Sequence, residues 1–351
     1  MHRSPTARMS RLLVAAIVAV ALAACSSSSD GASSTSTEPP TITAVKPTTT
    51  TTTTAPVASA GCDKPSTVKA GITEHTMMSG GVERKYLVDL PESYDGTKPW
   101  PIILGLHALS VSNAFIPGGI GFDKIETIHP FIGVAPSGRL DGPTPYWFAA
   151  PTADNYDVTF IGDLLDQLEA DLCVDSSQVF STGMSNGAQM SSLLACRLSD
   201  RITAIAAISG VEFLEPCDGK PVPVLAFHGT IDPILPYAGG GLNATKIADI
   251  QYWKGKIPAG MPAPLGVDES MRLWAEHNGC DPTPTETQVS PHVLRRIWNG
   301  CKAATVFYKI DGAGHQWPGM PMPSFDKSFG PGTKEIDATT ELARFFFQPR
   351  G

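Results

Sequence analysis

The stretch that most constrains the fold of this chain runs from Gln178 to Met190 and reads Gln-Val-Phe-Ser-Thr-Gly-Met-Ser-Asn-Gly-Ala-Gln-Met. A β-branched and aromatic run leads into the pattern Gly-x-Ser-x-Gly, centred on Ser185, and apolar residues at helical spacing follow. Strand, sharp turn and helix form the setting in which such a serine is an exposed nucleophile. In a chain with 33 glycines the five-residue pattern alone is weak, so its meaning depends on partners elsewhere.

The N-terminal region has the composition of an export signal followed by a tether. Three arginines precede an apolar run at 12–24, which is too short for a membrane span. The run ends in Leu-Ala-Ala-Cys, which resembles a bacterial lipoprotein box with Cys25 as the lipidated residue; an ordinary secretory signal is the alternative. Residues 26–60 are rich in Ser, Thr and Pro and predict a flexible tether. We therefore expect a signal peptide at 1–24, the lipidated cysteine and tether at 25–60, and one globular domain at 61–351.

Charge and cysteine usage narrow the class of protein. The formal net charge is −8, which argues against nucleic acid and anionic polymers as partners. Six cysteines besides Cys25 suggest three disulfides in an exported chain, with fifteen possible connectivities. Proximity in the sequence favours Cys196–Cys217 and Cys280–Cys301, which leaves Cys62–Cys173. No Cys-x-x-Cys pair occurs, so we expect no metal.

From residue 61 onward, strand-like and helix-like segments alternate. The segments at 72–78 and 82–90, separated by two glycines, predict an antiparallel hairpin. Further strands are expected at 101–107, 131–135, 202–208, 222–227 and 305–310. Helices are expected after an N-cap at Asp157, at 267–277 and at 335–347. This order predicts an α/β fold with one mixed, mostly parallel sheet, helices on both faces and no large lid domain.

Two polar loops follow strands at the edge where catalytic groups of such sheets gather. Asp232 follows the strand that ends at Phe227, and His315 lies in a glycine-rich loop after the strand that ends at Ile310. The order Ser185, Asp232, His315 is that of an α/β-hydrolase triad. His315 would act as the base and Asp232 would orient it. The alternatives are that Asp232 is a turn residue and that His315 is bonded to backbone.

The same reasoning assigns an oxyanion hole and a substrate pocket. The backbone N–H of Asn186 should act together with that of Ala108 or Leu109. Trp147 and Trp317 are candidates to line a pocket, with core packing as the alternative for each.

Three other polar residues after strands compete with this assignment. His107 and His228 end strands and are interpreted as structural hydrogen-bonding residues. Asp311 is the second candidate for the acid, but its closeness to His315 in the sequence makes the geometry harder.

Three segments together resemble the secreted polyhydroxybutyrate depolymerase and feruloyl esterase family of α/β-hydrolases. They are Gly-Met-Ser-Asn-Gly at 183–187, His-Gly-Thr-Ile-Asp-Pro at 228–233 and Gly-His-Gln-Trp-Pro-Gly at 314–319. The resemblance implies an α/β-hydrolase that cleaves carboxylic esters without a cofactor, with a triad of Ser185, Asp232 and His315. The chain departs from the family pattern at Ala108 and Ala188, where glycine is usual.

The sequence thus predicts an exported serine esterase, lipid-anchored to the outer face of the cell membrane through Cys25 or secreted. It would be monomeric and act on esters of the polyhydroxyalkanoate type, or on feruloyl or acetyl esters of polysaccharides. One alternative is a binding lipoprotein on a hydrolase scaffold with weak activity. Another is a serine peptidase on the same fold.

Overall fold

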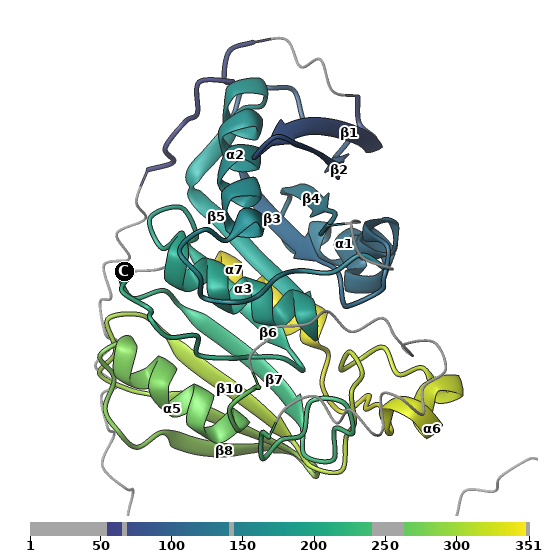
Figure 1. Ribbon diagram of the computed structural model, residues 1–351, viewed down its shortest axis with the longest axis vertical. Helices are drawn as coiled ribbons and strands as arrows, with labels where there is room; N and C mark the ends of the chain where they lie inside the picture. The colour runs from purple at the N-terminus through teal and green to yellow at the C-terminus, as the bar shows by residue number, and fades with distance from the viewer. Residues whose placement is uncertain (1–54, 65–68, 140–143, 241–262, 349–351) are drawn as a thin grey trace, which may run out of the picture. The chain divides into compact units, whose positions relative to one another are not determined.

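A ten-stranded sheet forms the centre of the domain, as the computed structural model in Figure 1 shows; the structure describes residues 55–64, 69–139, 144–240 and 263–348. In spatial order the strands are β1 (Gly71–Ser79), β2 (Val82–Leu90), β4 (Ile132–Pro136), β3 (Trp100–Leu106), β5 (Val174–Met184), β6 (Ala204–Ile208), β7 (Val224–Gly229), β10 (Thr305–Ile310), β9 (Val293–Trp298) and β8 (Thr285–Ser290). The strands from β4 to β10 are parallel, whereas β1, β2, β9 and β8 pair antiparallel with their neighbours. The predicted mixed, mostly parallel sheet is confirmed.

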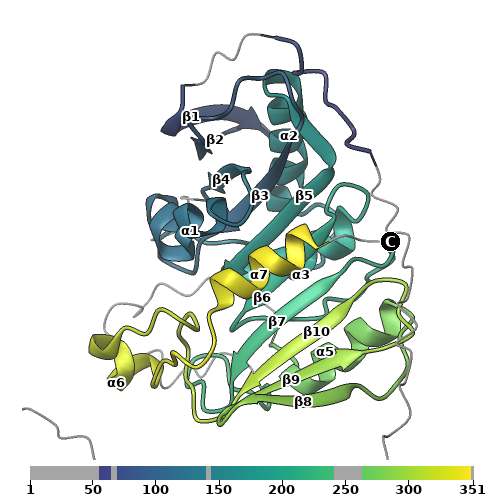
Figure 2. The ribbon, with the colours of Figure 1, turned by 180° about the vertical axis from the view of Figure 1, so that it is seen from behind.

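Helices cover both faces of this sheet. The structure has α1 (Phe122–Glu126), α2 (Tyr156–Asp171), α3 (Asn186–Arg197), α5 (Val267–His277), α6 (Asp326–Phe329) and α7 (Ala338–Phe347), with short helical turns at 113–115, 117–121 and 323–325. Residues of α2, α3 and α5 pack into one core cluster, on the side seen in Figure 1. Residues of α1 and α7 pack into a second cluster, on the side that faces the viewer in Figure 2.

The central strands are apolar on both sides because both faces are covered. In β6, Ile205 and Ala207 belong to the first core cluster, whereas Ala204, Ala206 and Ile208 belong to the second. Successive side chains of a strand point to opposite faces, so a strand buried on both sides reads as a continuous apolar run. This is why the buried strands could be predicted from such runs.

Two predicted helix boundaries are wrong. Asn155, and not Asp157, caps α2, since its side chain accepts hydrogen bonds from the backbone N–H groups of Asp157 and Val158. Asp157 is instead buried in an ion pair with Arg84, at 2.6 Å. The closing helix begins at Ala338 rather than at residue 335, because Asp337 provides its cap.

The residues just before position 61 contact the strand that leads to the elbow. The backbone N–H of Val57 donates to Asp175 Oδ1 at 3.0 Å, and that of Ser59 donates to the Val174 carbonyl at 2.9 Å. These residues, assigned to the tether by composition, therefore pack against the start of β5. The predicted lipidation site at Cys25 lies outside the described residues. In the part of the chain that the structure covers, no helix is long and apolar enough to cross a membrane.

The three predicted disulfides are confirmed. The pairs are Cys62–Cys173, Cys196–Cys217 and Cys280–Cys301. The first joins the N-terminal segment to the residue that precedes β5, and its loop spans 111 residues. Cross-links of this kind restrict the unfolded chain most when the loop they close is long.

Candidate active site

Ser185 lies at the sharp turn between β5 and α3. Its backbone has φ 58° and ψ −123°, and a positive φ is uncommon for a residue other than glycine. The turn is held on both sides: Ser185 N–H donates to the Ile208 carbonyl at 2.9 Å, and its own carbonyl accepts from Ala188 and Gln189. Strain of this kind persists where surrounding bonds fix it and is a feature of functional sites.

The two glycines of the motif are required by close packing against the end of β3. A Cβ atom on Gly183 would lie 2.6 Å from the Leu106 carbonyl oxygen, and one on Gly187 would collide with the same oxygen. Glycine at both positions therefore lets the elbow sit directly against β3, next to the loop that begins at His107.

Asp232 and His315 are brought together by neighbouring parallel strands. Asp232 follows β7 and His315 follows β10, and these two strands pair in parallel. His315 Nδ1 lies 2.6 Å from Asp232 Oδ2, and both side chains are almost fully buried. Asp311, the other candidate for the acid, is exposed and accepts a hydrogen bond from Thr230. The buried partner of His315 is Asp232.

The Asp232 carboxylate is strongly stabilised as an anion. Its Oδ1 accepts from the backbone N–H groups of Ile234 and Leu235, at 2.8 and 2.9 Å. Burial alone would raise the pKa of Asp232, but the charge of His315 and hydrogen bonds from His228 and His315 outweigh it and hold that pKa below its usual range. The group therefore keeps its negative charge at neutral pH.

The loop that carries His315 is fixed by the segment around α6. His315 N–H donates to the Phe329 carbonyl at 2.5 Å, and Gly314 N–H donates to the Pro331 carbonyl at 2.7 Å. The rings of His315 and Phe329 stack with centroids 6.2 Å apart. The imidazole is thus held both from its backbone and from its ring.

The loop after β3 meets the elbow where an oxyanion hole would form. Asn186 is the first residue of α3, and the first backbone N–H groups of a helix have no acceptor within it. Val111 N–H donates to the Ala108 carbonyl at 3.1 Å, which closes a turn with Leu109 and Ser110 at its centre. The positive φ of this turn falls on Ser110, at 65°, and not on Ala108.

His107 stabilises this loop, and its ring is held in one tautomer. Its Nδ1 lies 2.9 Å from the Ala108 carbonyl, which can only accept, so Nδ1 carries the proton. Its Nε2 accepts from Gly138 N–H at 2.9 Å. Burial lowers the pKa of His107 to about 4, so the ring is neutral at physiological pH. These contacts agree with the structural role predicted for this residue.

The two tryptophans proposed for a pocket are packed into the core. Trp147 is fully buried; its indole N–H donates to the His107 carbonyl, and its backbone binds the side-chain amide of Asn186 at 2.8 and 2.9 Å. Trp317 donates to Thr339 Oγ1 at 3.1 Å. Trp147 therefore links the loop after β3 to the elbow, and a role for either indole in binding substrate stays a prediction.

Comparison with known proteins identifies the family to which the chain belongs. No protein-family profile matches the chain. Feruloyl esterase D of Neurospora crassa is 35% identical over 79% of the chain and 88% of its own length. Feruloyl esterase C of Emericella nidulans is 30% identical over 75% and 85% of the two chains. The chain belongs to the feruloyl esterase family.

The structural comparison supports the same fold. An acetyl xylan esterase from Aspergillus awamori superposes with a TM-score of 0.51 at 16% identity, covering 70% of this chain and 94% of that one. The predicted α/β-hydrolase fold is confirmed, and the chain is, like its relatives, a carboxylic ester hydrolase.

A second buried acid lies behind the elbow of this esterase and was missed by the sequence analysis. Glu212 follows β6 and is 3% exposed; its Oε2 accepts from Gln189 Nε2 at 3.1 Å. Burial raises the pKa of Glu212 to about 7. Nothing in the surrounding Val-Glu-Phe marks it as buried, since glutamate after a strand is usually solvated.

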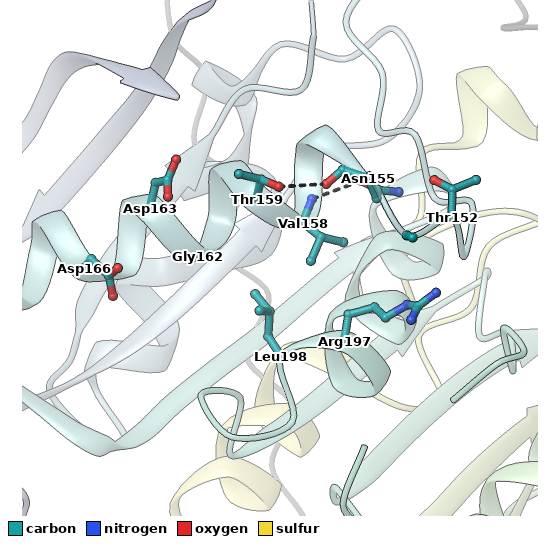
Figure 3. Close-up of a pocket in the computed structure, with 10 residues that line it drawn as sticks. Thr152, Asn155, Val158, Thr159, Gly162, Asp163, Asp166, Arg197 and Leu198 are labelled. Carbon is teal, nitrogen blue, oxygen red and sulfur yellow. Dashed lines mark hydrogen bonds between the residues drawn. The ribbon is translucent and has the colours of Figure 1, made fainter. Parts of the chain in front are cut away.

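A cavity with charged residues around it lies elsewhere in this esterase. It has a volume of about 440 Å³ and is bounded by α2 and the end of α3, with Asp163, Asp166 and Arg197 around it (Figure 3). Arg197 ends α3, whereas Ser185 precedes its first residue, so the cavity is not at the elbow. Among the described residues, no group of three or more His, Cys, Asp or Glu side chains is arranged to hold a metal ion.

Proposed function

We propose that this chain is an exported serine esterase in which Ser185 is the nucleophile, His315 the general base and Asp232 the acid that orients it. The observation that carries the proposal is the buried 2.6 Å bond between His315 Nδ1 and Asp232 Oδ2, formed at the edge of the sheet where Ser185 occupies a strained turn. Nucleophile, base and orienting acid in this chain order are the parts of an α/β-hydrolase triad.

The tautomer of His315 supports its role as a base. The ionised Asp232 carboxylate can only accept, so the proton shared with it belongs to His315 Nδ1. Nε2 of the neutral ring then has a free lone pair. In the proposed reaction it takes the Ser185 hydroxyl proton as the oxygen attacks the ester carbonyl, and it returns this proton to the leaving alcohol.

The acyl group would then be bound to Ser185 and released by water in a second pass through the same steps. The negative oxygen of each tetrahedral intermediate would be stabilised by the N–H of Asn186 and one N–H from the turn at Ala108 and Leu109. The helix dipole of α3 adds a positive potential at the same position, since Asn186 begins that helix.

The names of the relatives guide the choice of substrates. Because they are called feruloyl esterases, we propose aromatic acyl esters first, with hydroxyalkanoate and acetyl esters as the other classes. The purified protein should be assayed with methyl ferulate, hydroxybutyrate oligomers and p-nitrophenyl esters of increasing acyl length. A preference for methyl ferulate would support the aromatic class, and a preference for the oligomers would replace it.

The test of the nucleophile compares Ser185, which follows β5, with a control serine near the start of that strand. We expect Ser185→Ala to lose at least about a thousandfold in kcat and to lose labelling by a fluorophosphonate probe. Ser176→Ala, at the other end of β5, should keep both. Labelling of Ser185→Ala at the parent rate would refute the assignment.

Export and lipidation are part of the same proposal. Three disulfides support an oxidising compartment, where such bonds form and persist. Expression of Cys25→Ser should move the protein from the membrane fraction to the medium and abolish lipid labelling. An unchanged distribution would mean that Cys25 does not anchor the chain.

A further inference from the structure

A second histidine touches the acid of the proposed triad. His228, in the penultimate position of β7, is 2% exposed, and its Nε2 lies 3.3 Å from Asp232 Oδ2. The same nitrogen lies 2.9 Å from the carbonyl oxygen of Leu235. Asp232 Oδ2 is thus shared between His228 and His315, whereas Oδ1 is bound by two backbone N–H groups.

The contacts of His228 determine its protonation. Both neighbours of Nε2, a carbonyl and an ionised carboxylate, can only accept, so Nε2 carries a proton. Nδ1 is buried and has no hydrogen-bond partner among the described residues. A second proton there would be a buried donor without an acceptor, which is costly, so the neutral Nε2–H form is favoured.

Four N–H groups therefore face the Asp232 carboxylate, two on each oxygen, and that of His228 is shared with the nearer Leu235 carbonyl. The two on Oδ1 fix the position of the group, and the two on Oδ2 include one from outside the triad. Without the His228 N–H, Oδ2 would keep only the hydrogen bond from His315. The carboxylate could then rotate about the position that Oδ1 fixes, and its charge would act on His315 alone. His228 thus acts on the very atom that orients the proposed base.

We propose that His228 is a positioning residue of the active site: its Nε2–H holds Asp232 Oδ2 in line with His315 and limits how strongly Asp232 stabilises the protonated form of His315. This inference rests on the proposed triad. It differs from a purely structural role, in which His228 only closes the turn at 232–235 through the Leu235 carbonyl.

The surroundings of His228 allow this role to be tested separately. Besides Asp232, the titratable groups around its ring include Tyr237, whose ring is 6.0 Å away in an edge-on arrangement, and Glu212, which lines the same small cavity. Lys309, the register partner of His228 on β10, lies on the other side of the Tyr237 contact, with its Nζ 5.3 Å from that ring. Burial raises the pKa of Tyr237, so it stays neutral in the range of the assay. Glu212 titrates near neutral pH and must be controlled for.

The test compares His228→Gln with His228→Met. Both side chains have the same length, but only glutamine carries an N–H near the position of Nε2. We expect His228→Gln to retain kcat within about threefold, and His228→Met to lose about tenfold or more with little change in KM, as for a lost hydrogen bond to a charged group. His228→Asn, whose amide is one methylene too short, should resemble His228→Met.

The pH profile separates positioning from folding. In His228→Met, the unshared charge of Asp232 should stabilise the protonated His315 more strongly, so the acid limb of the kcat/KM profile should move to higher pH. His228→Gln should follow the parent profile. Each variant is also made with Glu212→Gln, so that titration of Glu212 cannot produce the shift, and Tm is measured to confirm folding.

Equal kcat and equal pH profiles for His228→Met and His228→Gln, with only Tm lowered, would overturn the proposal and leave a structural role. If His228→Met does not fold, His228→Asn decides by the same criteria. Fluorophosphonate labelling of Ser185 in the parent distinguishes failure of the proposed triad from failure of the role proposed for His228. A parent protein that is not labelled would refute the triad itself.

Discussion

Two buried carboxyl groups flank the elbow, and their pKa values are shifted in opposite directions. Asp232 and Glu212 are 4% and 3% exposed, and each lies in a loop after a central strand, β7 and β6 respectively. The pKa of Asp232 is held below its usual range, whereas that of Glu212 is raised to about 7. Burial is the same for both, so burial does not explain the difference.

The charge of His315 and the number of hydrogen-bond donors explain it. Asp232 accepts from two backbone N–H groups and two imidazoles, whereas Glu212 Oε2 accepts from Gln189 alone among the side-chain contacts of the described residues. Removing a carboxylate from water is unfavourable unless donors replace the lost hydration. The loop after β7 provides them and the loop after β6 does not. One acid is therefore suited to orient a base, and the other is a proton-binding site without an evident catalytic task.

The largest expected effect comes from removing the charge of Asp232. In Asp232→Asn, a side-chain atom that accepted a hydrogen bond from His315 Nδ1 becomes an N–H donor, so His315 is driven toward the wrong tautomer. We expect kcat to fall by about three to four orders of magnitude, as in other triads. Steady-state kinetics on a p-nitrophenyl ester measure this loss.

Glu212→Gln is the matched control for that substitution. It also replaces a buried carboxyl group by an amide next to the elbow, but we expect kcat to change by less than about threefold. Comparable losses in the two variants would mean that the contrast between the acids has no bearing on catalysis.

The next largest effect is on stability. Here the substitution of Glu212, and not that of Asp232, is the informative one. The pKa of Glu212 is raised from 4.5 to about 7 in the folded state, so its contribution to stability is fully present below pH 4.5 and is lost as the pH rises to about 7. The loss is on the order of 3 kcal/mol. Glu212→Gln should therefore be more stable than the parent at pH 8 and similar to it at pH 4.

Chemical denaturation of both proteins at several pH values checks this expectation. A difference in unfolding free energy that does not change between pH 4 and pH 8 would show that folding does not raise the pKa of Glu212. Asp232 must contribute with the opposite sign, because its pKa is lowered: its contribution is present above its unfolded pKa and is lost in acid.

One of these two acids could be predicted from the sequence and the other could not. Asp232 was predicted because it follows a strand and precedes His315 in a known chain order. Glu212 and the contact of His228 with Asp232 were not predicted, since both depend on how loops fold back after β6 and β7. The spacing of residues in the sequence does not reveal which side chains such loops bring into contact.

The fold shows the same limit. Buried strands such as β6 were predicted from apolar runs, whereas β8 was missed because its residues, Thr-Glu-Thr-Gln-Val-Ser, are mostly exposed and polar. The cap of α2 was placed two residues too late, on Asp157, because both Asn155 and Asp157 are good capping residues. Only the ion pair of Asp157 with Arg84, far apart in the sequence, decides between them.

A smaller effect is expected from Gln189, the one side-chain donor to Glu212 within the described ranges of the chain. Gln189→Leu removes the hydrogen bond that favours the ionised form, so the pKa of Glu212 should rise further. The pH at which stability falls should move upward by less than about one unit. The pH dependence of the unfolding free energy reports this shift; a downward movement would contradict the role assigned to Gln189.

The smallest effect is expected on the other side of the elbow, at Ala108. Ala108 has no positive φ, since in this loop the left-handed residue is Ser110, so alanine fits its backbone without strain. Ala108→Gly should leave kcat for p-nitrophenyl acetate within about twofold and destabilise the fold by about 0.5–1 kcal/mol through the entropy of the unfolded chain. Because neither Asp232 nor Glu212 is touched, this loss should be the same at pH 4 and pH 8, in contrast to the effect of Glu212→Gln. A several-fold rise in kcat with KM unchanged would instead show that the methyl group restrains the oxyanion loop.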